Sequence, residues 1–150
     1  MAQVIIEVEK MRVGYTSGVF DLFHIGHLNV LRNAKSMCDH LIVGVSTDEL
    51  VYKYKQKWPI FPHLERIELL RHITYVNTVV AQEDMDKMKM WRRLKFDVMF
   101  VGDDWLDTPE WQQFETDFKA NGVEIIFFPY FKGTSSTKIN NILDRHDMPE

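Results

Sequence analysis

Short apolar runs alternate with amphipathic stretches along almost the whole chain. The runs rich in Val, Ile and Phe have the length of strands, and they cover residues 12–16, 40–46, 77–81, 97–101 and 123–128. Apolar residues recur at helical spacing in the stretches 25–37, 64–73, 84–94, 109–122 and 135–143, whereas lysines, aromatics and prolines at 52–62 predict a loop. Because strands that alternate with helices form parallel sheets with right-handed crossovers, we expect an α/β fold. It should be a Rossmann-like three-layer sandwich with a five-stranded parallel sheet.

Composition and charge describe an ordinary globular domain. With 150 residues, the chain is expected to form one domain over 1–150, in which residues 1–10 are a prefix that adds an edge strand or stays loose. The formal net charge of −4 argues against non-specific binding to nucleic acid or to a membrane surface. One cysteine, Cys38, rules out an internal disulfide, and no apolar stretch approaches the roughly 18 residues that span a bilayer. We therefore expect a cytoplasmic protein with no nucleic-acid partner and no membrane insertion.

The most informative segment follows the first predicted strand and runs from Gly18 to His27 (GVFDLFHIGH). His24 and His27 stand three residues apart where a helix should begin, so they share one helix face. A helix N-terminus offers unpaired N–H groups and a partial positive charge, which suit a phosphate, and two imidazoles beside it can donate to the same oxygens. An isolated H-x-x-H pattern is more often a solvated pair in a first helical turn. The strand before it, together with Gly18 and Gly26, favours a phosphate site here.

Ligands of parallel sheets bind beyond the carboxyl ends of the strands, and two further strand ends carry candidate chemistry. After the second strand, Ser46–Glu49 leads into a lysine-rich stretch. Lys53 or Lys55 could follow a phosphate there, unless this stretch is a solvated basic loop. After the fourth strand come Gly102 and the segment Asp103–Trp105, whose carboxylates could accept from a hydroxyl or amine or hold Mg²⁺. The alternative is a helix-capping turn with a packed Trp.

A fourth segment precedes the last predicted helix. Gly133 is followed by a row of hydroxyl residues, Ser135, Ser136 and Thr137. Together they offer more N–H and O–H donors than one helix cap requires. Neither a G-x-x-x-x-G-K-[ST] phosphate loop nor a G-x-G-x-x-G turn is present, which weakens kinase and dinucleotide-binding interpretations.

Taken in order, these segments resemble the cytidylyltransferase family within the larger nucleotidyltransferase superfamily. The resemblance extends over about residues 12–143 and is strongest to the glycerol-phosphate branch. It is carried by G-x-F-D-x-x-H-x-G-H at 18–27, S-T-D-E at 46–49, Glu65-Arg66, Tyr75-Val76, G-D-D-W at 102–105 and G-T-S-S-T-K-I at 133–139. It implies a homodimer and a CTP-dependent transferase that joins CMP to a phosphorylated alcohol, with glycerol phosphate as the favoured acceptor. The products would be a CDP-alcohol and pyrophosphate, and Mg²⁺ would be bound with CTP.

The resemblance also implies roles for individual residues. His24 and His27 would donate to the triphosphate, Lys55 (or Lys53) would bridge phosphates, and Arg66 would contact a phosphate bidentately. The remaining substrate-binding candidates are the segment Gly18, Val19, Phe20 and Asp21, the acidic segment Asp103, Asp104 and Trp105, and the late segment Gly133, Ser135, Ser136 and Thr137.

The sequence departs from this family's pattern at several positions. Thr74 and Tyr130 stand where relatives usually carry arginines that meet phosphates, and Val19 replaces a threonine, as in the phosphocholine branch. Phosphocholine, phosphoethanolamine or a phosphonate are therefore alternative acceptors. Adenylyl transfer, as in sugar-phosphate or flavin relatives, is disfavoured by the G-D-D-W match. An alternative of another class is a non-catalytic nucleotide-binding protein.

Overall fold

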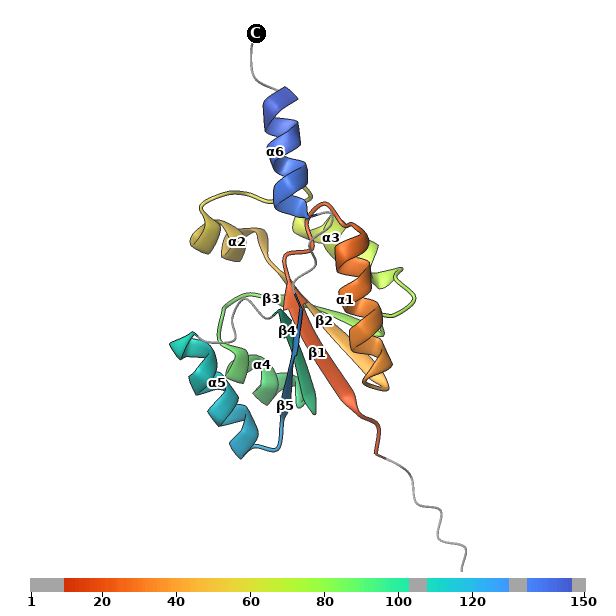
Figure 1. Cartoon of the computed structure of the whole chain (residues 1–150), viewed down its shortest axis with the longest axis vertical. Helices are drawn as coiled ribbons and strands as arrows, with labels where there is room; N and C mark the ends of the chain where they lie inside the picture. Colours follow the sequence, from red (N-terminus) through yellow and green to blue (C-terminus); the bar gives the residue numbers. More distant parts are fainter. Residues whose placement is uncertain (1–9, 103–107, 130–134, 147–150) are drawn as a thin grey trace, which may run out of the picture.

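A parallel sheet lies at the centre of the molecule (Figure 1). The computed structural model describes residues 10–102, 108–129 and 135–146. Within them, five strands pair in parallel in the order β3-β2-β1-β4-β5. The strands are β1 (Val13–Gly18), β2 (His40–Ser46), β3 (Thr78–Gln82), β4 (Val98–Gly102) and β5 (Glu124–Phe128). This confirms the predicted α/β sheet, and the chain reverses its direction of strand addition between β1 and β4, where ligands of such sheets bind.

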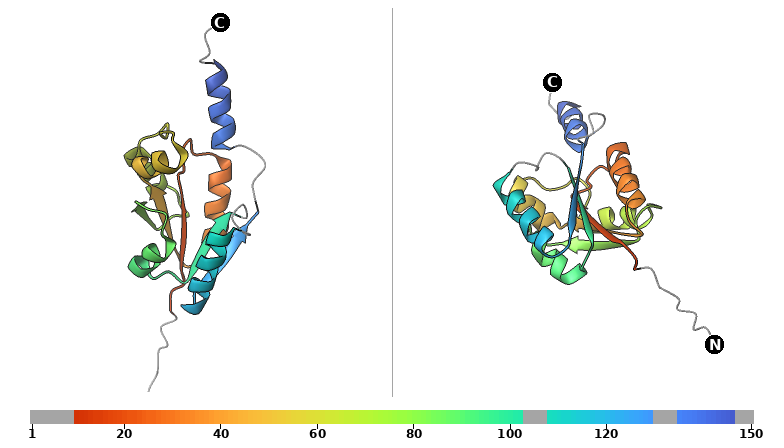
Figure 2. Two further views of the ribbon diagram at one scale, coloured as in Figure 1. Left: turned by 90° about the vertical axis from the view of Figure 1, so that its left-hand side faces the viewer. Right: turned by 60° about the horizontal axis from the view of Figure 1, so that its bottom comes forward.

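Helices cover both faces of the sheet, as Figures 1 and 2 show. The helices are α1 (Ile25–Ser36), α2 (Asp48–Lys55), α3 (His63–Arg71), α4 (Lys87–Leu94), α5 (Pro109–Ala120) and α6 (Ser136–His146). α1 and α3 pack against one face and α4 and α5 against the other, while α6 projects from the body. None of the helices in the described part of the chain combines the length and apolar composition that a membrane-spanning segment needs.

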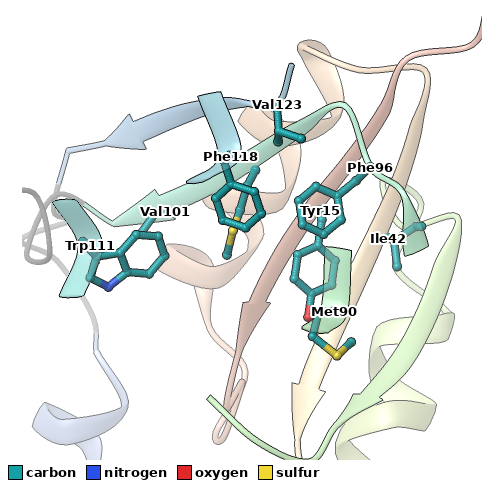
Figure 3. Packing of buried hydrophobic residues seen from close by; sticks show 9 residues of the cluster. Tyr15, Ile42, Met90, Phe96, Val101, Trp111, Phe118 and Val123 are labelled. Atoms are coloured by element: carbon teal, nitrogen blue, oxygen red, sulfur yellow. The ribbon is translucent and has the colours of Figure 1, made fainter. Parts of the chain in front are cut away.

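The two hydrophobic cores follow the alternation of side chains along the strands. In β4, Val98 and Phe100 face the core under α1 and α3, whereas Met99 and Val101 face the core under α4 and α5. Figure 3 shows the second core, in which the ring of Tyr15 stacks on Phe96 with centroids 4.8 Å apart. Strands that are buried on both faces read as continuous apolar runs, which explains why the sequence pattern located them.

The predicted loop at 52–62 is wrong in its first part, because α2 continues to Lys55. Thr47 caps this helix by accepting from the Leu50 N–H at 3.2 Å, and Gln56 ends it in the left-handed conformation. The helix predicted at 84–94, which is α4, begins later than expected, at Lys87 rather than residue 84. The prefix 1–10 lies outside the described residues except for its last residue.

Candidate active site

A cavity of about 900 Å³ opens at the carboxyl ends of the strands. Every strand contributes to its wall near its end, through Ser17 and Gly18, Ser46, Gln82, Gly102 and Phe128. The starts of α1 and α6 complete the wall on one side, and residues of α4 and α5 line the other. The cavity therefore occupies the crevice where the topology predicts a ligand.

The two histidines of the loop after β1 form the start of α1. Phe20 and Leu22 adopt positive φ angles of 54° and 49°, which turn the chain sharply between strand and helix. His24 is the N-cap, and its Nδ1 accepts from the Gly26 N–H at 3.0 Å. His27 Nδ1 accepts in return from the His24 N–H at 3.2 Å, and the two rings stack with centroids 3.9 Å apart. Both histidines line the cavity.

This capping arrangement fixes the tautomer of both rings. Because each Nδ1 accepts a backbone N–H, the proton of the neutral ring sits on Nε2, which is left as a donor. Burial lowers the pKa of both imidazoles, and burial together with the neighbouring His24 lowers the pKa of His27 to about 4. At neutral pH the pair therefore offers two uncharged Nε2–H donors at the mouth of a helix N-terminus.

The hydroxyl residues at the start of α6 line the same cavity as the histidines. The Ser136 hydroxyl donates to the backbone carbonyl of Asp21 at 2.5 Å and so attaches α6 to the histidine loop. Ser135 Oγ accepts from the Lys138 N–H at 3.0 Å, which makes it a helix cap, and Thr137 is exposed. The predicted convergence of Ser135–Thr137 with His24 and His27 is confirmed, although two of the three hydroxyls also hold the loop structure.

Arg66 is not available to a phosphate, and the predicted bidentate contact is wrong. Its side chain is fully buried and does not line the cavity. Its guanidinium donates to the carbonyls of Phe61, Val19 and Ser46, each at 2.8 Å, and to the Asp48 carboxylate at 2.6 Å. Arg66 therefore ties together three segments around the cavity.

Asp21 has a similar structural role. It is buried and lines the cavity, but its carboxylate accepts from the Ile60 and Phe61 N–H groups, both at 2.8 Å. Both oxygens are used to hold the segment that precedes α3. The expectation that Asp21 contacts the substrate stays a prediction, since the residue lines the cavity while two backbone N–H groups hold its carboxylate in place.

The remaining predicted residues fall into three groups. Lys55, Gly18, Val19 and Phe20 line the cavity. Lys53 is exposed and is not among the lining residues, so Lys55 is the favoured lysine of the two. The segment Asp103–Trp105, Gly133 and Tyr130 lie outside the described residues.

Sequence reasoning missed two buried polar residues of the cavity wall, Lys87 and Gln82. Lys87 Nζ donates to Ser17 Oγ at 3.0 Å, and burial lowers the pKa of this lysine to about 8. Gln82 Oε1 accepts from the Tyr15 hydroxyl at 2.7 Å. Lys87 begins a methionine-rich amphipathic helix, where a lysine reads as part of the solvated face, so the sequence pattern carries no signal for its burial.

Comparison with known proteins identifies the family of this chain. The family model described as cytidylyltransferase-like matches residues 15–142. The FAD synthase of Thermococcus kodakarensis is 34% identical over 140 residues, which is 91% of this chain and 92% of that protein. The glycerol-3-phosphate cytidylyltransferase of Bacillus spizizenii is 35% identical over 130 residues, 86% of this chain and 95% of that protein.

A solved structure has a similar fold over most of the chain. The lipopolysaccharide core biosynthesis protein from Thermoplasma volcanium GSS1 has a TM-score of 0.68 and 26% identity, and the match covers 83% of this chain and 100% of that one. The relatives carry different names at similar identity, so they define the family of the chain but leave its substrates open.

Proposed function

This chain belongs to the cytidylyltransferase-like family, with nucleotidyltransferases among its relatives, and on that premise we propose that it transfers CMP from CTP to a phosphorylated alcohol. Glycerol phosphate is the favoured acceptor. A phosphate oxygen of the acceptor forms a bond to the α-phosphorus of CTP, and the bond from that phosphorus to pyrophosphate breaks. The bonding electrons leave with pyrophosphate, and no covalent enzyme intermediate is needed.

The observation that supports this proposal is the gathering of phosphate-binding groups around one cavity. The Nε2–H donors of His24 and His27, the start of α6 and the ammonium of Lys55 all belong to its wall. Fixed donors aimed at developing charge lower the barrier without reorganising during the reaction. The imidazoles are neutral, so the positive charge that balances the triphosphate has to come from lysine or from a metal ion.

We propose that Mg²⁺ binds together with the nucleotide. Within the described residues, no three His, Cys, Asp or Glu side chains gather as a metal cluster. The Asp21 carboxylate lines the cavity but is already occupied by two backbone N–H groups. These residues fit an ion carried by the phosphates and water, which is how Mg²⁺ is commonly held at nucleotides, and its contribution would be charge neutralisation.

A second candidate function is adenylyl transfer that forms FAD. The observation in its favour is the identity to archaeal FAD synthases, 34% for the protein of Thermococcus kodakarensis and 37% for that of Pyrococcus horikoshii. The same donors would bind either CTP or ATP, because they would contact the triphosphate rather than the base.

The test measures pyrophosphate release with CTP or ATP against glycerol 3-phosphate, phosphocholine, phosphoethanolamine and FMN. We expect turnover with CTP and glycerol 3-phosphate. Turnover confined to ATP and FMN would establish the second candidate, and nucleotide binding without any turnover would favour a non-catalytic protein.

A variant of the N-cap separates the phosphate role from the structural role of the histidines. In His24→Asn, the amide oxygen can still accept from the Gly26 N–H, but the distal donor is lost. We expect kcat to fall on the order of 10²- to 10⁴-fold with the unfolding midpoint nearly unchanged. His72→Asn is the matched control, because His72 is exposed at the end of α3 and does not line the cavity. A wild-type kcat in His24→Asn would exclude the phosphate role.

A further inference from the structure

Lys87 carries a buried ammonium that the proposed chemistry has not yet used. The residue is 6% exposed, and its Nζ has one hydrogen-bond partner, the Ser17 hydroxyl. In the described part of the chain, no carboxylate lies within 4.0 Å of this nitrogen. Two of its three N–H groups are therefore left for a ligand. A charge buried without a counter-ion is costly, so the arrangement calls for an anion in the cavity.

Two further polar residues accompany Lys87. Ser17 Oγ accepts from the ammonium, and its hydroxyl also interacts with the Tyr15 oxygen, so Ser17 positions the ammonium at the cavity wall. Gln82 is 1% exposed and lines the cavity, and its Oε1 is held by the Tyr15 hydroxyl. Its side-chain NH₂ has no partner among the described residues, which leaves two donor hydrogens.

The fold positions this group by means of a glycine in the strand between β1 and β3. Tyr15 on β1 reaches Gln82 on β3 by crossing β2 at Gly44, where a Cβ would overlap the Tyr15 hydroxyl. The Tyr15 ring is fully buried and stacked on Phe96, so it cannot move away easily. The amide of Gln82 is consequently held in place at the cavity wall.

These donors lie on the other side of the β1 end from the histidines. Lys87 begins α4, which covers one face of the sheet, whereas His24 and His27 begin α1 on the opposite face. Both groups line the same cavity. Nucleotidyl transfer brings a second anion, the acceptor phosphate, next to the triphosphate, and their repulsion has to be balanced by a cation that also aligns the attacking oxygen.

We propose that Lys87, positioned by Ser17, and Gln82 bind the phosphate of the acceptor, a phosphomonoester. This inference rests on the proposed transferase function and assigns the acceptor end of its cavity. Lys87 transfers no proton: it balances the charge of the phosphate whose oxygen attacks the α-phosphorus. Thr74, one position where relatives carry arginine, is exposed and does not line the cavity, so the described wall draws its lysine charge from Lys55 and Lys87.

The test compares Lys87→Met with Lys89→Met by steady-state kinetics with CTP and glycerol 3-phosphate, and by calorimetric titration of CTP. Lys89 is the matched control, because it lies on the same helix but is exposed and pairs with Asp84 at 2.9 Å. We expect Lys87→Met to raise the KM for glycerol 3-phosphate about 10- to 100-fold, with the Kd for CTP within about twofold of wild type. Lys89→Met should leave both values within about twofold.

A pH profile adds a readout that a purely structural lysine would not move. Asp84, just before α4, is the charged group that acts on Lys87, and it also acts on the buried Tyr15 together with Arg93 of α4. Glu110 of α5 and Lys55 of α2 are further charged residues of the same cavity wall. The lowered pKa of Lys87 predicts that the KM for glycerol 3-phosphate rises above about pH 8 in the wild type and stays flat there in Lys87→Met. Replacing a buried charge by an apolar side chain of similar length should preserve the fold.

The outcomes distinguish this inference from the proposed function. An unchanged acceptor KM, or an equal loss of CTP and acceptor binding, overturns the assignment of Lys87. If the wild type binds CTP but turns over no acceptor, the transferase proposal fails, and calorimetric binding of glycerol 3-phosphate then decides about Lys87. Binding by the wild type that is lost in Lys87→Met supports the anion site, and equal binding or no binding by both proteins overturns it.

Discussion

Replacing Arg66 by methionine should weaken the fold rather than a phosphate contact. The side chain is fully buried, and its four hydrogen bonds join the histidine loop at Val19, the end of β2 at Ser46, the segment before α3 at Phe61, and the Asp48 carboxylate. Methionine fills most of the same volume but leaves three carbonyls and one carboxylate without this donor. Removing one partner of a buried ion pair costs roughly 3–5 kcal/mol. For a chain of this length, that lowers the melting temperature by about 6–20 °C.

The assay is urea denaturation at neutral pH for wild type, Arg66→Met and the control Arg71→Met. Arg71 lies on the same helix, but its side chain is 60% exposed and its ion pair with Glu68 is long at 3.9 Å. Its loss should therefore cost less than about 0.5 kcal/mol. If Arg66→Met kept its free energy of unfolding within about 1 kcal/mol of wild type while losing CTP binding, Arg66 would be a phosphate ligand after all and its buried network would be unimportant.

Two further predictions concern stability. The pKa of His27 is about 4 in the native state and 6.5 in the unfolded chain, so the unfolded state binds this proton more readily as the pH falls. The free energy of unfolding is therefore highest above pH 6.5, and it should be about 2 kcal/mol lower at pH 5. Denaturation at pH 7.5 and 5 should show this loss in wild type and a smaller one in His27→Gln, and equal losses would contradict it. Gly44→Ala should cost about 1–3 kcal/mol because the new Cβ overlaps the buried Tyr15 hydroxyl, and Tyr15→Phe in the same chain should recover part of that cost. A Gly44→Ala protein as stable as wild type would show that Tyr15 can shift.

The strands and the position of the site could be predicted because both follow from patterns along the chain. β2 was located to the residue, since a strand buried on both faces is a continuous apolar run between polar ends. The sequence pattern does not predict α2, because its eight residues mix lysines and tyrosines without a clear apolar face and its main signal is the Thr47 cap. Once the strands are known, the parallel topology brings the histidine loop and the late hydroxyl segment to one edge of the sheet.

The roles of individual side chains could not be predicted in the same way. A motif gives the residue type at a strand end but not the direction of the side chain. Arg66 stands in a segment that matches the family, yet its side chain is fully buried outside the cavity wall, whereas Asp21 lines the cavity and also holds two backbone N–H groups. Lys87 gave no signal, because its burial depends on how α4 packs beside the end of β1.

The burial of the two cavity lysines assigns them different tasks in the proposed reaction. Lys55 lies in the last turn of the short helix α2 and is exposed, so its long side chain can follow charge as it moves from the α-phosphorus to the leaving pyrophosphate. Lys87 is buried and its ammonium is held by Ser17, so it cannot move with a departing group. Its charge can therefore stabilise only a group that keeps its position during the reaction. The acceptor phosphate is such a group, because its own phosphorus stays bound while one of its oxygens forms the new bond. In the proposed reaction, a mobile cation for the leaving group and a fixed one for the attacking phosphate, with neutral imidazoles in the same cavity, would stabilise the transfer without binding either anion too tightly in the ground state.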